Sequence, residues 1–154
     1  IKVLGADGKW SNLDSRVAMK LHTVINAEGE LAARTLAMPA NTNPSGDIFG
    51  GWIMSLMDAA GAMTATKHAG ARVVTVAATE MAFLRPVKVG DAVCCYAEPV
   101  ATGRSSIALH VEVWVLRQGQ GERIKVTEAE FTFVALDGRG KPRAIRRDGA
   151  AGPA

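Results

Sequence analysis

The stretch NPSGDIFGGWIMSLMDAAGAM, residues 43–63, decides the fold of this chain. From Phe49 to Ala69 it has the length and composition of one helix, about 30 Å long at 1.5 Å per residue. Apolar and small residues fall on all sides of this helix. That pattern predicts burial all round, with another element packed close to the helix backbone.

Two carboxylates interrupt this apolar run. Asp47 stands at its mouth and Asp58 in its middle. An ionised carboxylate is costly in apolar surroundings unless it is paired, hydrogen-bonded or used in chemistry. Asp47 is the candidate N-cap of the helix, because its side chain can accept a hydrogen bond from the first turn.

The segments around the helix predict strands, since they alternate or run apolar, contain β-branched residues and are separated by turn formers. They are residues 31–38, 71–86, 91–103, 105–119 and 123–136. The order of one strand, one helix and four strands predicts an α+β fold, with a sheet wrapped around a central helix. The short links favour an antiparallel meander, or a close variant, for the last four strands.

Length and composition indicate a single folded domain. The chain has 154 residues, of which 48% are hydrophobic and 21% charged. No apolar run is long enough to cross a bilayer, and the first residues hold no apolar signal core, so a cytoplasmic location is expected. The net charge of +3 owes much to GRGKPRAIRRD, residues 138–148. That segment is either a solvated tail or a contact for a partner that bears phosphates.

Several chemistries lack their motifs. There is no G-x-S-x-G, no P-loop, no G-x-G-x-x-G after a strand and no zinc-type Cys/His spacing. The adjacent Cys94 and Cys95 are interpreted as small packing residues. His22, His68 and His110 have no spacing that favours a metal, and His110 is predicted to be structural.

Asp47 also has the parts of a catalytic group. It is followed after two residues by Gly50 and Gly51, and glycines at a helix start let a ligand approach the free backbone N–H groups. Those N–H groups would stabilise a developing oxyanion, while the carboxylate acts as base or nucleophile on an acyl derivative. A plain capping role for Asp47 remains the alternative.

Asp58 lies eleven residues further along the chain, on nearly the same helix face but about 16 Å away along the axis. Within one chain, Asp47 and Asp58 therefore cannot share a substrate. A second copy of the helix, antiparallel across a twofold axis, would place its Asp58 beside this Asp47. The alternative is a buried acid satisfied by Ser55 or by a neighbouring strand.

Three segments in order, NPSGDIFGGWIMSLMDAAGA, RVVTVAATEMAFLRPVKVGD and GRSSIALHVEVWV, resemble the hotdog-fold acyl-CoA thioesterases. The likeness is greatest to their bacterial YciA-like branch and extends over about residues 31–143. Each motif alone is weak, but their combination is specific.

The resemblance implies a hotdog fold: a long helix wrapped by a five-stranded antiparallel sheet, with dimers that join their sheets edge to edge and assemble further as trimers of dimers. It implies hydrolysis of acyl-CoA to fatty acid and coenzyme A at the dimer interface. Asp47 matches the acid that acts on the thioester, and Asp58 matches a second acid that some relatives take from the partner helix. The backbone at Gly50 and Gly51 matches the oxyanion donors.

The resemblance also implies a set of residues for the coenzyme A portion of the substrate. No metal and no separate cofactor is expected, and the expected partners are acyl-CoA and other copies of this chain, not nucleic acid or membrane. The residues that match regions near coenzyme A are Arg85, Arg104, Ser105 and Ser106, and the basic residues placed to meet its phosphates are Lys141 and Arg143.

Two other functions compete with this one. A hotdog hydratase or dehydratase needs a histidine near the start of the helix, but the chain has Gly46 at that position. A non-enzymatic acyl-CoA sensor coupled to DNA would need a DNA-binding element, and the first 30 residues show no helix-turn-helix pattern. The predicted organisation is an arm at residues 1–30, one hotdog domain at 31–145 and a flexible tail at 146–154.

Overall fold

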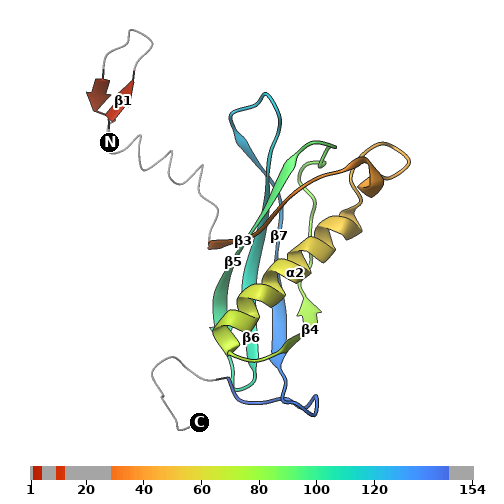
Figure 1. The fold of residues 1–154 in the computed structure, drawn as a ribbon, viewed down its shortest axis with the longest axis vertical. Coiled ribbons are helices and arrows are strands. Elements are labelled where there is room, and N and C mark those ends of the chain that lie inside the picture. Colours follow the sequence, from red (N-terminus) through yellow and green to blue (C-terminus); the bar gives the residue numbers. More distant parts are fainter. Residues whose placement is uncertain (1, 5–9, 13–28, 146–154) are drawn as a thin grey trace.

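The computed structural model describes residues 2–4, 10–12 and 29–145. One long helix lies across one face of a five-stranded antiparallel sheet (Figure 1). The helix is α2, Gly50–Ala69, and a short 3₁₀ turn, η1, precedes it at Pro39–Asn41. The strands of the sheet are β3 (Glu30–Leu36), β4 (Val73–Ala78), β5 (Ala92–Thr102), β6 (Ser106–Leu116) and β7 (Arg123–Ala135).

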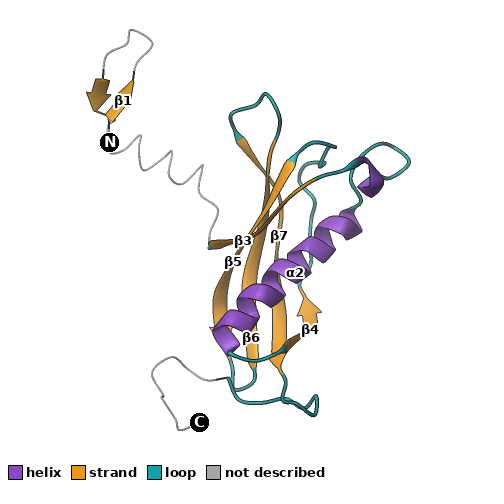
Figure 2. Cartoon of the chain, in the orientation of Figure 1, coloured by secondary structure: helices purple, strands orange, loops and turns teal. Residues whose placement is uncertain are grey.

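The spatial order of the strands is β3-β5-β6-β7-β4, and every pair is antiparallel. The predicted α+β class and five-stranded sheet are confirmed. A meander exists only from β5 to β7. The fold is therefore not a four-strand meander but a variant of it. In the chain α2 lies between β3 and β4 and crosses the face of the sheet, and β4 joins at the far edge beside β7 (Figure 2).

Helix α2 begins without a side-chain cap. Its N-cap residue is Phe49, with φ −55° and ψ 132°, and no side chain bonds to the first turn. The expectation that Asp47 caps the helix is therefore wrong, since Asp47 lies two residues too early. The helix ends at Gly70, whose φ of 62° is left-handed and whose N–H donates to the carbonyl of Thr66. Glycine adopts this conformation without a steric penalty.

One face of α2 packs on the sheet. Its side chains Ile53, Met57, Ala60 and Ala65 belong to the main core. Gly61 is needed for close packing, because a Cβ there would lie 2.9 Å from the ring of Phe133.

The opposite face of α2 is open in the single chain, which corrects the prediction of burial all round. Met54 and Met63 are 44% and 54% exposed, and Gly51, Ser55 and Ala59 are exposed as well. The sequence pattern did not distinguish a helix buried on all sides from one with an open face.

The three central strands form the rest of the core. Alternate residues of β5, β6 and β7 point toward α2 and are almost fully buried. They include Val93, Cys95, Leu109, Val111, Val113, Phe131 and Phe133. Both cysteines are buried and free, and burial raises the pKa of the Cys95 thiol to about 12. A thiolate nucleophile at Cys95 is therefore disfavoured at neutral pH.

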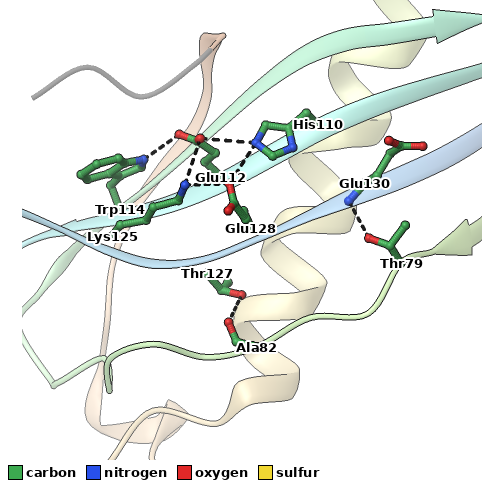
Figure 3. Close-up of polar contacts among 9 residues, drawn as sticks. All are labelled: Thr79, Ala82, His110, Glu112, Trp114, Lys125, Thr127, Glu128 and Glu130. Carbon is green, nitrogen blue, oxygen red and sulfur yellow. Dashed lines mark hydrogen bonds and ion pairs between the residues drawn. The ribbon is translucent and has the colours of Figure 1, made fainter. Parts of the chain in front are cut away.

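Strand β4 is shorter than the predicted strand at residues 71–86. The regular ladder with β7 has a bulge between Thr75 and Ala77 and ends at Ala78. The chain then runs on beside β7 through scattered bonds. The N–H of Thr79 donates to the carbonyl of Glu130. The N–H of Glu130 donates to the Thr79 hydroxyl, and the Thr127 hydroxyl donates to the carbonyl of Ala82 (Figure 3). A side chain thus replaces a ladder bond, and residues 81–87, apolar except for Arg85, form an irregular segment.

The predicted N-terminal arm contains two short strands, β1 (Lys2–Leu4) and β2 (Trp10–Asn12), which pair antiparallel. The sequence pattern did not predict them. Most of the arm, and all of the predicted tail at residues 146–154, lies outside the described residues. Within the described part of the chain, no helix combines the length and apolar character that crossing a membrane requires.

Candidate active site

The loop before α2 holds Asp47 near the N-terminal end of the helix. The side-chain oxygen of Asn43 accepts the N–H groups of Ser45 and Asp47 at 2.9 and 3.1 Å, and the N–H of Asn43 donates to the carbonyl of Asp47. An isolated bridge between Thr42 and Ile48 closes the loop. These bonds fix the backbone of Asp47 without using its carboxylate.

The carboxylate of Asp47 forms an ion pair with Lys88, whose Nζ donates to Oδ1. The two side chains are 34% and 50% exposed. An ion pair in contact with solvent contributes about 0–1 kcal/mol to folding, so this pair is a minor part of the stability. Sequence analysis missed Lys88. The two residues are 41 positions apart, and no local pattern links them.

Two backbone donors stand beside Asp47. The N–H groups before and after them are used: Ile48 donates to Val87, Phe49 to Asn41, and Trp52 to Phe49. Among the hydrogen bonds of the described residues, none uses the N–H of Gly50 or Gly51. The first N–H groups of a helix have no intrahelical acceptor, which leaves these two at the positive end of α2 for a ligand.

A cavity of about 270 Å³ opens next to these donors. Ile48, Gly50 and Ile53 form its helix side. The irregular segment after β4 forms the other side with Phe83, Leu84, Arg85, Pro86 and Val87. Gly50 and the predicted residue Arg85 line this mainly apolar pocket, whereas Asp47 and Gly51 are not among its lining residues and are the sequence neighbours of Ile48 and Gly50, which are.

Asp58 does not reach this cavity. It lies eleven residues along α2, and its Oδ1 accepts a 2.5 Å hydrogen bond from the hydroxyl of Thr75 in β4. The neighbouring strand therefore satisfies this acid, while Ser55 donates instead to the carbonyl of Trp52. Within one chain, Asp47 and Asp58 are therefore not part of the same site.

The other predicted coenzyme A residues lie at the far end of the helix. The N–H of Ile145 donates to Arg104, that of Ala135 to Ser105, and that of Leu136 to Arg72, which closely follows the end of α2. Ser106 begins β6 beside the same turn. These bonds place Arg104, Ser105 and Ser106 about 30 Å from the mouth of α2, by the rise of a 20-residue helix.

Lys141 and Arg143 lie at the same end. The carboxylate of Asp137 accepts the N–H groups of Arg139 and Lys141 at 2.8 and 3.0 Å, and the N–H of Arg143 donates to Ala135. The bonds from Lys141 and then Arg139 hold the pKa of Asp137 below its ordinary value, with a smaller contribution from the charge of Arg143. This turn therefore carries a group of cations outside the cavity of its own chain.

A second polar cluster lies on the outer face of the sheet, away from α2 (Figure 3). His110 Nε2 lies 3.3 Å from Glu112 and 3.1 Å from Glu128, and Trp114 Nε1 donates to Glu112 at 2.9 Å. The three groups His110, Glu112 and Glu128 are close enough to share a metal ion. However, Lys125 Nζ already donates to Glu112 and Glu128, at 3.2 and 2.6 Å, and places one positive charge between the two carboxylates.

The pKa of Lys125 reflects this environment. Partial burial lowers it, but the hydrogen bonds to Glu128 and Glu112 outweigh that effect and raise the pKa overall. Lys125 therefore keeps its charge, and the cluster is an ion-pair network, in agreement with the structural interpretation of His110.

The comparisons with known proteins agree with this geometry. The thioesterase superfamily pattern matches residues 45–122, which include Asp47, α2 and the segment after β4. The acyl-CoA thioester hydrolase YciA of Escherichia coli is 55% identical over 121 residues, 77% of this chain and 92% of the relative. An uncharacterized acyl-CoA thioester hydrolase of Haemophilus influenzae is 54% identical over 125 residues, 79% of this chain and 81% of the relative.

Solved structures similar to this chain are thioesterases as well. The hexameric thioesterase y2039 from Yersinia pestis is 56% identical, with a TM-score of 0.75 over 79% of this chain and 98% of that one. A hexameric broad-specificity acyl-coenzyme A thioesterase is 54% identical, with a TM-score of 0.75 over 80% and 86%. The chain belongs to the thioesterase superfamily and to its YciA-like branch of hotdog acyl-CoA thioester hydrolases, as the resemblance implied.

Proposed function

We propose that this protein hydrolyses acyl-CoA thioesters to free acid and coenzyme A, with Asp47 as the general base or nucleophile. The observation that carries the proposal is the position of Asp47 beside the two available N–H groups of Gly50 and Gly51 and the apolar cavity. Relatives at 54–56% identity with the same fold are acyl-CoA thioesterases by name. One of these relatives was also solved with an aspartate replaced by alanine.

The chemistry follows from the arrangement. The thioester carbonyl docks at the helix mouth with its oxygen toward the N–H groups of Gly50 and Gly51, which stabilise the negative charge that forms on it. The Asp47 carboxylate either attacks the carbonyl carbon or takes a proton from the attacking water. With Asp47 as base, the water oxygen bonds to the carbonyl carbon, the carbon–sulfur bond breaks, and the proton taken from water passes to the leaving sulfur, which gives free acid and the coenzyme A thiol. With Asp47 as nucleophile, the carbon–sulfur bond breaks as a mixed anhydride forms, and water then hydrolyses the anhydride, which restores the carboxylate and supplies the proton of the thiol. The acyl chain lies against Ile53, Phe83 and Leu84.

The direct test is release of free thiol from a panel of acyl-CoAs of different chain length. We expect turnover of several chain lengths, since the apolar cavity recognises the acyl chain by contact alone. No thiol release from any member of the panel would contradict the proposal and would favour a binding protein.

The histidines do not support a hydratase. His110 is bound to Glu112 and Glu128 on the outer face of the sheet, and His68 is exposed in the last turn of α2, far from the cavity. His22 lies outside the described residues. No histidine of the described chain is therefore placed for proton transfer at the mouth of the helix.

The complete site needs a second copy of the chain. The exposed face of α2, the open edge of β4 and the 30 Å between Asp47 and the basic turn all indicate a partner. We propose a homodimer joined at the β4 edges, and a trimer of such dimers, because related thioesterases are hexameric. The second copy would supply its Asp58 and its cations Arg104, Lys141 and Arg143, with Ser105 and Ser106, to the coenzyme A portion.

A charge on the edge of β4 should abolish activity by preventing dimer formation. Val76 is 56% exposed on this edge, so Val76→Lys leaves the core of the single chain unchanged. Light scattering should show a monomer with little thioesterase activity. Leu36→Lys on the opposite edge strand β3 is the matched control, since Leu36 is 57% exposed. A fully active monomer would rule out a site shared between chains.

Removing a cation that grips the nucleotide of coenzyme A should raise KM more than it lowers kcat. We expect about a 10-fold increase in KM, the scale of one charge-assisted hydrogen bond, for Arg104→Ala or Lys141→Ala. A pantetheine thioester lacks the nucleotide phosphates, so its KM should change little. Equal losses on both substrates would show that these residues act through the fold instead. A related acyl-CoA hydrolase from Staphylococcus aureus, 34% identical, has been solved in complex with coenzyme A, and its bound nucleotide can be compared with the positions of Arg104 and Lys141.

A further inference from the structure

A buried carboxylate, Asp91, holds the turn at residues 86–91, whose first two residues line the cavity. Asp91 is 1% exposed, and three donors satisfy it. Arg117 Nε donates to Oδ1 at 3.1 Å, Arg117 Nη2 donates to Oδ2 at 3.0 Å, and the N–H of Lys88 donates to Oδ2 at 2.9 Å. An ionised carboxylate is costly to bury without such partners, so the three donors are what allows Asp91 to lie inside the protein.

Arg117 contacts both ends of this turn. Besides Asp91, its Nη2 donates to the carbonyl of Pro86 at 3.1 Å. Arg117 is the first residue after β6, which ends at Leu116. Its planar guanidinium group can bind the Asp91 carboxylate and the Pro86 carbonyl at the same time. The Asp91 hydrogen bonds raise the pKa of Arg117, so it stays charged.

The same turn forms part of the proposed site. Pro86 and Val87 line the cavity, and the carbonyl of Val87 accepts the N–H of Ile48 at 3.0 Å. Lys88 then reaches Asp47 with its ammonium group. The clamp and the acid are therefore connected through one residue: the N–H of Lys88 binds Asp91, and its Nζ binds Asp47.

We propose that Asp91 and Arg117 are positioning residues that act through Lys88 on Asp47. Lys88 is half exposed and has a long side chain, so it can direct a carboxylate only if its backbone is held in place. Its contact with Oδ1 restrains the Asp47 carboxylate through one of its two oxygens. The inference rests on the proposed role of Asp47 and adds the residues that orient it.

The test compares kcat and KM of Lys88→Met, Arg117→Met and the double variant, all on acyl-CoA with the full-length oligomer. Each single change should lower kcat about 10-fold with a smaller change in KM, since a misplaced catalytic group loses rate more than binding. The double variant should lose no more than about 10-fold, because both changes remove the same orientation. Lys88→Arg should restore most of the rate.

Arg123→Met is the matched control. Arg123 binds the Tyr96 hydroxyl on the outer face of the sheet, so its replacement should leave kcat unchanged.

Two further variants keep the inference testable. Arg117→Lys keeps the charge but cannot reach both Asp91 and Pro86, so a folded variant with an intermediate kcat is expected even where Arg117→Met fails to fold. In an Asp47→Asn background, Lys88→Met should cause no additional loss. Multiplicative losses in the double variant, a normal kcat in folded Arg117→Lys, or a full additional loss in the Asp47→Asn background would overturn the inference. The role of Asp47 itself fails separately, if Asp47→Asn alone keeps its turnover.

Discussion

The Asp47→Asn enzyme is expected to fold and assemble normally but to lose about 100-fold or more of kcat, the usual scale for removing a general base. Asparagine keeps the size of the side chain and can still accept a hydrogen bond from Lys88. It can neither attack the carbonyl nor take a proton from water. Since the ion pair with Lys88 is half exposed, its loss should change the free energy of unfolding by less than about 1 kcal/mol.

Turnover, KM and thermal unfolding of Asp47→Asn and Asp47→Ala together test whether Asp47 serves catalysis or stability. Both variants should be poorly active and nearly as stable as the parent, because Asp47 does not cap α2 in the structure. KM should change less than kcat, since the cavity and the coenzyme A contacts are intact. A folded, fully active Asp47→Asn enzyme would falsify the catalytic assignment.

The second large effect is expected at Gly51. A Cβ at this position meets nothing within 4 Å in the single chain, and glycine is a poor helix former, so Gly51→Ala should fold with unchanged or slightly raised stability. The added methyl group would stand where the thioester carbonyl approaches the helix N–H groups. We expect kcat/KM to fall by roughly 100-fold, similar to the loss of one oxyanion donor.

Ser55→Ala is the control for Gly51→Ala. Ser55 lies four residues further along the same exposed helix face, and its hydroxyl donates to the carbonyl of Trp52. Its removal should leave activity within a few fold. Light scattering of both variants separates a blocked carbonyl site from a disturbed contact between chains. Normal kcat/KM in Gly51→Ala would remove the N–H groups of Gly50 and Gly51 from the mechanism.

The fold was largely predictable because its signals are local. The long run of apolar and small residues after Phe49 predicts the helix, and four of the five strands begin and end within about three residues of the predicted bounds. The placement of Asp47 two residues before Phe49, with Gly50 and Gly51 following, is a local feature too. These elements depend on residues that are neighbours in the sequence, where composition and period carry the information.

Only the tertiary structure decided how these pieces form a site. The order β3-β5-β6-β7-β4 depends on the path of α2 across the sheet, and beyond Ala78 the chain is joined to β7 by scattered bonds, one of them from the side chain of Thr127. The pairs Lys88–Asp47 and Arg117–Asp91 join residues 41 and 26 positions apart. A charged residue in a loop has the same local pattern whether it is solvated or bound to a distant acid. Such contacts arise from packing, and no short stretch of sequence encodes them.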